Sequence, residues 1–236
     1  MIQIRRFLYS CLINVLTSNF VTTLIHQFFI KTPWLIKKIF PSYVWNMPAG
    51  EKNIYLSFDD GPHPEITPFV LEELKKNNAK ATFFCVGSNV ALYPDVYRQI
   101  LQDGHTVGNH TYNHPNGWET STKEYLDEVA MASKFIETNL FRPPYGRIKK
   151  QQAKGLNEAM DIRNVKVIMW DVLSLDFDTS FSPSQCLDNV MKNSTDGSIV
   201  VFHDSEKAFS NLKYSFPRAI KGLAEEGYSF RKIELL

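Results

Sequence analysis

From residue 53 to the C-terminus, short apolar runs alternate with segments in which apolar residues recur at helical spacing. Runs rich in β-branched and aromatic residues are typical of strands, and those that lack a polar face indicate strands covered on both sides. The expected strands are 53–58, 81–86, 105–109, 140–142, 165–170, 198–202 and 229–234. The expected helices are 68–77, 94–102, 122–138, 149–160, one beginning at 183, and 217–226.

Local signals set several of these boundaries. Thr67 followed by Pro68 resembles an N-cap with proline at the first helical position. Ser121 and Glu124 have the spacing of a capping box, which begins the longest expected helix. Alternation of about seven strands with helices predicts parallel βα units, arranged either as a closed or distorted barrel or as a doubly wound sheet.

Composition fits a single folded domain. With 236 residues, 44% hydrophobic residues and 17 Phe, the chain can bury a substantial core. Lys and Arg number 26 against 25 Asp and Glu, and no basic stripe stands out, so we expect no nucleic-acid partner. Three widely spaced cysteines favour neither a disulfide framework nor a thiolate metal site.

The first 50 residues differ from the rest. Residues 7–30 contain no Asp, Glu, Lys or Arg and are long enough to cross a bilayer, although several polar residues interrupt them. They suit either an uncleaved membrane anchor or interfacial helix, or a loosely packed extension. Residues 31–48 are expected to be a linker that packs onto the domain. We therefore divide the chain into a leader and linker, 1–50, and a catalytic domain, 51–236, located in the cell envelope, with a cytoplasmic location as the alternative.

Unusual polar groups follow five of the expected strands. In a βα barrel these positions are the C-terminal strand ends, where active sites assemble. The five groups are Asp59-Asp60, His110 to His114, Arg142 to Gly146, Asp171 to Asp176, and His203-Asp204.

A metal site is one interpretation of these groups. Asp59-Asp60 before Gly-Pro could simply close a strand in an Asx turn, and a lone His-x-x-x-His pair is often coincidental. His110 and His114 are four residues apart, however, and Asp60 would complete a set of two histidines and one carboxylate. Such a set suits catalytic Zn²⁺, and it also suits non-haem Fe(II).

The motifs Ser-Phe-Asp-Asp-Gly-Pro, His-Thr-Tyr-Asn-His, Arg-Pro-Pro-Tyr-Gly, Trp-Asp…Asp and Val-Phe-His-Asp occur in this order. Together they resemble the five motifs of the polysaccharide deacetylases, carbohydrate esterase family 4, over roughly residues 50 to 236. The resemblance implies a distorted (β/α) barrel with its active site at the C-terminal strand ends. It also implies a divalent metal, usually Zn²⁺ but also Co²⁺, Ni²⁺ or Mn²⁺, and removal of acetyl groups from N-acetylglucosamine polymers or acetylated xylan. For this chain, peptidoglycan or a chitin-like polymer is the expected substrate.

The resemblance also implies a role for each matching residue. Asp59 would be the general base and His203 the general acid, with Arg142 orienting Asp59 and Asp176 tuning His203. Three residues would bind the metal, namely Asp60, His110 and His114, and Thr111 would brace their loop.

Substrate contacts are expected at four positions. The backbone N–H of Tyr145 would help to hold the oxyanion, and Val201 would line the pocket for the acetyl methyl group. Phe177 stands where the family usually has Trp, and Val201 where Leu is common, so the shape of this pocket departs from the family pattern. Trp118 and the Tyr145 ring are candidates for stacking on sugar rings.

Two further functions remain open at this point. A carbohydrate-binding pseudoenzyme on the same fold is disfavoured, because the implied catalytic set is complete. An Fe(II) oxygenase is disfavoured because alternating βα units do not resemble the antiparallel barrel usual for those enzymes, which is an argument from fold analogy alone.

Overall fold

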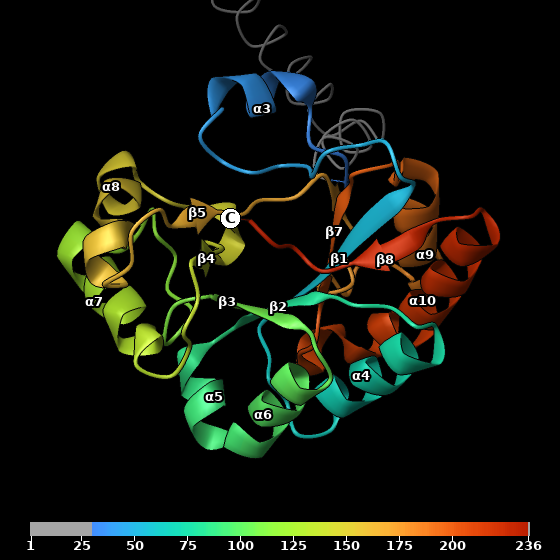
Figure 1. Cartoon of the computed structure of the whole chain (residues 1–236), viewed down its shortest axis with the longest axis horizontal. Helices are drawn as coiled ribbons and strands as arrows, with labels where there is room; N and C mark the ends of the chain where they lie inside the picture. Colours follow the sequence, from blue (N-terminus) through green and yellow to red (C-terminus); the bar gives the residue numbers. More distant parts are fainter. Residues whose placement is uncertain (1–29, 236) are drawn as a thin grey trace, which may run out of the picture.

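The computed structural model describes residues 30–235, in which eight parallel strands form one strongly curved sheet (Figure 1). The strand order is β5-β4-β3-β2-β1-β7-β6, and β8 pairs with the first half of β1. The strands are β1 (Asn53–Asp59), β2 (Thr82–Cys85), β3 (Thr106–Asn109), β4 (Leu140–Phe141), β5 (Lys166–Val167), β6 (Val172–Leu173), β7 (Ile199–His203) and β8 (Ser229–Arg231). The expected distorted (β/α) barrel is confirmed.

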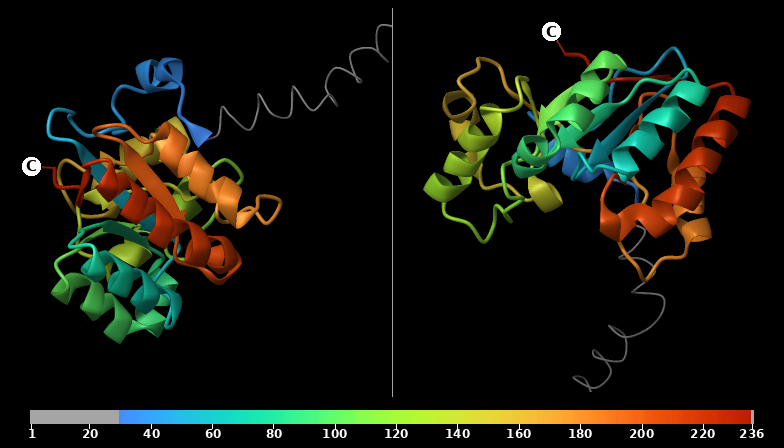
Figure 2. Two further views of the ribbon diagram at one scale, coloured as in Figure 1. Left: turned by 90° about the vertical axis from the view of Figure 1, so that its right-hand side faces the viewer. Right: turned by 90° about the horizontal axis from the view of Figure 1, so that it is seen from below.

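Helices cover the outside of this sheet, with α7 and α8 at one side and α9 and α10 at the other (Figure 2). The helices are α3 (Trp34–Ile39), α4 (Ile66–Lys76), α5 (Gly87–Leu92), α6 (Pro94–Gln102), α7 (Thr122–Ser133), α8 (Lys150–Ala159), α9 (Pro183–Asn193) and α10 (Glu206–Glu225). A single 3₁₀ turn, η1 (Pro144–Gly146), follows β4.

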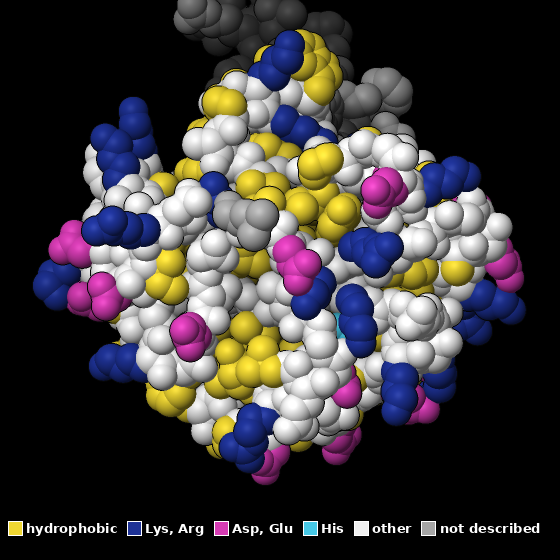
Figure 3. Space-filling model, viewed as in Figure 1, with side chains coloured by type: hydrophobic (Ala, Val, Ile, Leu, Met, Phe, Trp, Pro, Cys, Tyr) yellow, Lys and Arg dark blue, Asp and Glu magenta, His cyan; other side chains and the backbone are white. Residues whose placement is uncertain are grey.

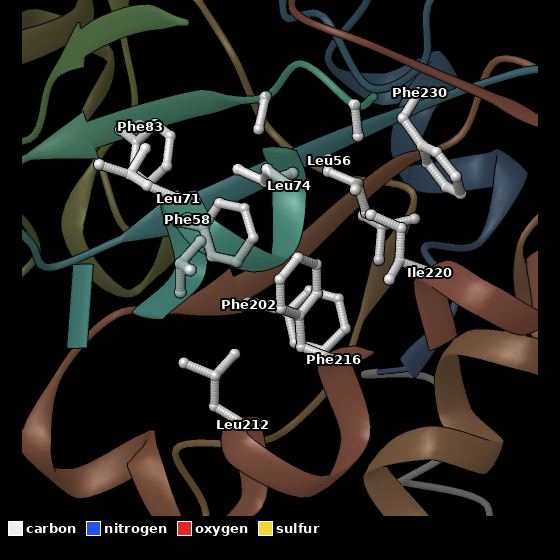
Figure 4. Packing of buried hydrophobic residues seen from close by; sticks show 14 of the residues in the cluster. Leu56, Phe58, Leu71, Leu74, Phe83, Phe202, Leu212, Phe216, Ile220 and Phe230 are labelled. Carbon is white, nitrogen blue, oxygen red and sulfur yellow. The ribbon is translucent and has the colours of Figure 1, made fainter. Parts of the chain in front are cut away.

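The main core lies between the sheet and the helices α4 and α10 (Figure 4). Phe58 of β1 is fully buried at its centre, and its ring centroid lies 5.1 Å from those of both Phe83 and Phe216. Offset and edge-on aromatic contacts of this kind stabilise a core beyond the apolar area they bury. They hold β1, which ends in the two adjacent aspartates, against its neighbours.

Residues 168–171 form a seam where the barrel nearly closes, because they join β5 and β6, the two ends of the strand order. Residues 30–49, here called the N-terminal strap, cover this seam by backbone hydrogen bonds. The N–H of Val44 donates to Val167, that of Met169 donates to Val44, and that of Thr32 donates to Asp171. The expected linker is therefore paired to the barrel edge, and the domain boundary at residue 50 stays a prediction.

Several element boundaries differ from those expected. The helix expected from Pro68 begins at Ile66, and Thr67 inside it uses its hydroxyl to bond Asp204 instead of capping. The helix expected from Pro217 begins at Glu206 instead, and Pro217 lies in its interior. The helix expected to reach 138 ends at Ser133, and the apolar run 165–170 pairs as a strand only over β5.

The expectation of a membrane anchor is wrong for the part of the chain that the structure describes. No helix within residues 30–235 is long and apolar enough to cross a membrane. Nearly all of the candidate anchor, residues 7–30, lies outside the described residues. Apolar side chains do gather at α3 (Figure 3), where Trp34, Ile39 and the following Phe40 are exposed.

The strap is held to the seam by a buried carboxylate. Asp171 is 1% exposed and accepts hydrogen bonds from Lys31, Lys37 and Ser198, at 2.6, 2.5 and 2.5 Å. Burial raises the pKa of Asp171, but the bonds from the two lysines outweigh it and lower the pKa overall. The stabilisation by this charge cluster is therefore present at neutral pH and is lost as pH falls through the folded-state pKa.

We predict that replacing both Lys31 and Lys37 with Met lowers the free energy of unfolding by roughly 2–4 kcal/mol, because the buried charge then loses both cations. Urea unfolding at pH 7 measures this loss, and Asp171→Asn in the double variant should recover part of it. Lys38→Met is the matched control, since Lys38 lies over the Trp34 ring and not at Asp171. If the double variant lost the same free energy of unfolding at pH 3 as at pH 7, the role of the Asp171 charge would be contradicted.

Candidate active site

Strand register brings the chemically distinctive residues to one rim of the barrel. Asp59, the last residue of β1, pairs with His203, the last residue of β7. Asn109 at the end of β3 pairs with Phe141 at the end of β4, so the next residues, His110 and Arg142, also leave the sheet side by side. Four of the five expected motifs thus meet at the C-terminal strand ends. The fifth motif, Asp171 to Asp176, joins the same rim at Asp176, which bonds His203.

Arg142 is fully buried and crosses the inside of the seam. Its Nη1 donates to Asp59 Oδ1 at 2.6 Å and to Ser57 Oγ at 2.9 Å. Its Nε and Nη2 donate to the carbonyls of Ile168 and Met169 at 3.2 and 3.0 Å. A guanidinium is a rigid planar fork that stays protonated, so these four bonds fix the orientation of the Asp59 carboxylate.

Asp60, His110 and His114 form a cluster that could hold a metal ion, with one ligand atom from each residue lying within 4.8 Å of the others. His114 Nε2 lies 3.2 Å and His110 Nε2 3.7 Å from Asp60 Oδ1. Asn89 donates to the backbone carbonyl of Asp60 at 2.8 Å, which steadies the carboxylate from behind.

Hydrogen bonding and burial prepare these side chains for a cation. His110 Nδ1 donates to the Arg142 carbonyl at 2.7 Å, which leaves the Nε2 lone pair directed at Asp60. Burial lowers the pKa of His110 to about 4, so its imidazole is neutral at pH 7. Burial raises the pKa of Asp60, but the hydrogen bond to His114 and the charges of nearby histidines outweigh it and lower the pKa. Two imidazole nitrogens and an ionised carboxylate oxygen, brought together beside an open rim, fit a divalent metal.

Unusual backbone conformations set the direction of these side chains. Asp60, Thr111, His114 and Tyr145 have φ values of 80°, 65°, 58° and 59°, in the left-handed region that non-glycine residues rarely adopt. Such residues cluster at functional sites, where the surroundings hold them in place at a cost of about 1–3 kcal/mol each. Thr111 supplies one such constraint, since its hydroxyl accepts from the His114 N–H at 3.1 Å and donates to the His110 carbonyl.

His203 is paired with a buried carboxylate. Its Nδ1 donates to Asp176 Oδ1 at 2.8 Å, and its backbone N–H donates to Asp176 Oδ2 at 2.9 Å. Burial lowers the pKa of His203, but the charge and hydrogen bond of Asp176, together with the nearby Asp60 and Asp59, outweigh it and raise the pKa to about 9. The imidazole is therefore protonated at neutral pH, and no hydrogen bond within residues 30–235 engages its Nε2.

The residues expected to contact substrate lie in different surroundings. Val201 is fully buried in a small apolar cluster that includes Phe177. The Phe177 ring lies 4.7 Å from the His203 ring, and the Tyr145 ring lies 4.6 Å from that of His114. Tyr145 and Trp118 are 62% and 61% exposed, and Arg147 lies over the Trp118 ring at 5.2 Å.

The sequence pattern places Asp171 and Asp176 in one motif. In the structure only Asp176 bonds His203, whereas Asp171 bonds the N-terminal strap. Three supporting residues were not predicted from the sequence. Ser57 accepts from Arg142, Asn89 donates to the Asp60 carbonyl, and Ser174 donates to Asp176 at 2.9 Å. Ser57 had a usable signal, because it is a polar residue inside an apolar strand. Asn89 had none, since it lies in a short helix remote in sequence from Asp60.

Comparisons with known proteins agree with this geometry. The family model described as polysaccharide deacetylase matches residues 46–163. A peptidoglycan-N-acetylglucosamine deacetylase of Bacillus cereus is 34% identical over 170 residues, which cover 70% of this chain. The chain spans 60% of that relative's length.

Solved structures share the fold. The peptidoglycan deacetylase PdaC of Bacillus subtilis superimposes with a TM-score of 0.69 at 32% identity, covering 78% of this chain and 89% of that one. A carbohydrate esterase family 4 pseudoenzyme from Bacillus anthracis has a TM-score of 0.71 at 29% identity, covering 82% of this chain and 68% of that one. The chain belongs to the polysaccharide deacetylase family of hydrolases, as the motif resemblance indicated.

We predict that Asp60→Ala and His114→Ala each lose bound metal and activity together, because a site with three protein ligands loses most of its affinity when one is removed. Metal content of the purified variants measures the effect. His105→Gln is the control, since His105 is buried at the opposite end of β3, where it accepts from the Ala81 N–H. Full metal content in either ligand variant would refute the ligand assignment.

Proposed function

We propose that this protein is a metal-dependent deacetylase that removes acetyl groups from an acetylated polysaccharide or oligosaccharide. The N-acetylglucosamine units of peptidoglycan or a chitin-like polymer are the proposed substrate, and the names of the relatives support that choice. The observation that carries the proposal is the rim arrangement, in which Asp59 and His203 are register partners beside the Asp60 cluster.

Asp59 is proposed as the general base. Arg142 occupies its Oδ1, so the second carboxylate oxygen is available to accept a proton from the attacking water. The guanidinium also holds the carboxylate still, which keeps the base aligned with its target. Asp59 is 5% exposed, so little bulk water competes for that oxygen.

His203 is proposed as the general acid. A protonated imidazole whose Nδ1 is held by Asp176 can deliver its Nε2 proton to the leaving nitrogen. The raised pKa keeps that proton in place until the tetrahedral intermediate forms. Base and acid thus approach the scissile amide from neighbouring strands.

Asp60, His110 and His114 are proposed as ligands of Zn²⁺ or of Co²⁺, Ni²⁺ or Mn²⁺. A divalent metal held by these residues would polarise the acetyl carbonyl and lower the pKa of a bound water. The backbone N–H of Tyr145 is proposed as a second donor to the oxyanion. Val201 and Phe177, which pack in one cluster next to His203, are proposed to border the pocket for the acetyl methyl group.

The binding-only alternative deserves a direct test, because a pseudoenzyme shares this fold. Acetate release from chitooligosaccharides, peptidoglycan and acetylxylan separates the two functions. Release from at least one substrate by the metal-loaded protein supports the deacetylase. Binding to these glycans without any acetate release supports the pseudoenzyme instead.

Asp59→Asn should keep the metal, because the three proposed ligands remain, yet lose roughly 10²–10⁴-fold in kcat. Metal analysis and acetate release on the same sample check both statements. An Asp59→Asn variant with unchanged kcat would exclude Asp59 as the base.

The pH dependence of kcat/KM should be bell-shaped. Its acidic limb belongs to deprotonation of the Asp59 site as a unit, and its basic limb to loss of the His203 proton. The basic limb should fall between the ordinary pKa of 6.5 and about 9. Asp176→Asn removes a negative neighbour and should move this limb to lower pH, whereas an unmoved limb would mean that His203 and Asp176 do not act as the acid pair.

A further inference from the structure

The rings of His110 and His114 are held in different ways, although one loop between β3 and α7 carries both. The His110 ring is 2% exposed, and its Nδ1 donates to the Arg142 carbonyl at 2.7 Å. The His114 ring is 25% exposed, and in the described part of the chain its only polar contact is with Asp60. A metal-binding histidine is usually oriented by a hydrogen bond to its second ring nitrogen. Because His114 lacks such a bond within residues 30–235, the direction of its ring depends on the backbone that carries it.

That backbone has a conformation which other contacts must maintain. Thr111 and His114 both have positive φ values, 65° and 58°. The conformation of His114 is unusual for a second reason, because the residue before a proline, here Pro115, normally has an extended backbone. A backbone of this kind persists only where its surroundings hold it in place.

Two neighbouring helices, α5 and α7, hold the loop (Figure 1). At the start of α5, the N–H of Gly87 donates to the Thr111 carbonyl at 2.9 Å, and the N–H of Ser88 donates to the Tyr112 carbonyl at 3.0 Å. A Cβ on Gly87 would lie 2.8 Å from Cδ2 of Tyr112, so α5 and the loop are in close contact. The next residue, Asn113, is held from the other side by α7.

A single carboxylate of α7, that of Glu128, accepts both hydrogen bonds from Asn113. The backbone N–H of Asn113 donates to Glu128 Oε2 at 2.7 Å, and Asn113 Nδ2 donates to Glu128 Oε1 at 2.9 Å. Glu128 thus fixes both the backbone and the side chain of the residue directly before His114. Among the ion pairs of residues 30–235 none includes Glu128, whereas the adjacent Asp127 pairs with Lys123 at 2.6 Å. The carboxylate of Glu128 is therefore committed to the loop.

We propose that Glu128 is a positioning residue that keeps His114 in the direction required to bind the metal. It acts through Asn113, since its own carboxylate bonds the loop and not the Asp60 cluster. This inference rests on the proposed metal-dependent function, with Asp60, His110 and His114 as ligands, and adds an outer residue to that site. The two bonds fix the peptide group ahead of His114, so the ligand is preorganised before the ion binds.

The affinity of the metal-free, full-length protein for Zn²⁺, measured by competition with a chromogenic chelator, tests this role. Glu128→Gln should lower the affinity about 10-fold, because the amide offers one acceptor oxygen to two Asn113 donors. Asp127→Asn is the matched control, since it removes the adjacent charge of the same helix without touching the loop. Its Zn²⁺ affinity should stay within about 2-fold of that of the unaltered protein.

A donor–acceptor exchange separates this contact from a general effect on α7. Asn113→Asp alone places two carboxylates opposite each other and should lower the affinity at least about 10-fold. In the double variant Asn113→Asp/Glu128→Gln, the introduced amide can donate to the introduced carboxylate and accept from the N–H at position 113. The double variant should therefore recover to within about 3-fold of the unaltered protein, which independent losses at the two positions would not allow.

The outcomes distinguish this inference from the function on which it rests. Unchanged Zn²⁺ affinity in Glu128→Gln, or a double variant as weak as Asn113→Asp, would overturn the positioning role of Glu128. In either case, Zn²⁺ binding by the unaltered protein and its loss in His114→Ala would leave the ligand assignment intact. No Zn²⁺ binding by the unaltered protein would overturn both.

Discussion

Arg142 is a guanidinium with no exposure to water, and both the closure of the barrel and the orientation of Asp59 depend on it. A buried charge of this kind is tolerated only when it is paired and its donors are satisfied. Asp59 provides the opposite charge, and the carbonyls of Ile168 and Met169 at the seam take further donors. Its planar group also lies 4.0 Å from the centroid of the Phe84 ring. The same contacts that hold the seam from inside thus hold the proposed base.

Each carboxylate of the rim has a different partner, and the proposed roles follow these differences. Asp59 faces a permanent cation, Asp60 faces two imidazoles, and Asp176 faces one. Asp204, next in sequence to His203, takes no part in this set, because it accepts from the Gly61 N–H and the Thr67 hydroxyl below the rim. Burial raises its pKa to about 7, as expected for an acid without a cation. The four neighbouring acids therefore differ in their contacts as the proposed roles of base, metal ligand, partner of the acid and structural support require.

Sequence motifs predicted the class of fold and most of the rim, because βα alternation and strand-end polar residues are local signals. The roles of Asp171 and Asp176 could not be separated in the same way, since Asp171 is defined by lysines more than 130 residues away. The left-handed backbone conformation of His114 could not be predicted either, because a histidine does not favour that conformation on its own. The true start of α10 was missed because proline usually marks a first turn, yet Pro217 lies in the helix interior.

The buried network leaves little freedom at the centre of the site, and this limits where substrate preference can arise. A change at Arg142, Asp59 or Asp176 would leave a partner charge buried and unpaired, so these positions affect folding and chemistry together. Trp118 and the Tyr145 ring are free of that constraint, because both are exposed. Exposed rings at such positions can affect which sugar binds without disturbing the buried charges. Choice of glycan is therefore expected to depend on the exposed rim, while the proposed deacetylation chemistry is expected to depend on the buried contacts beneath it.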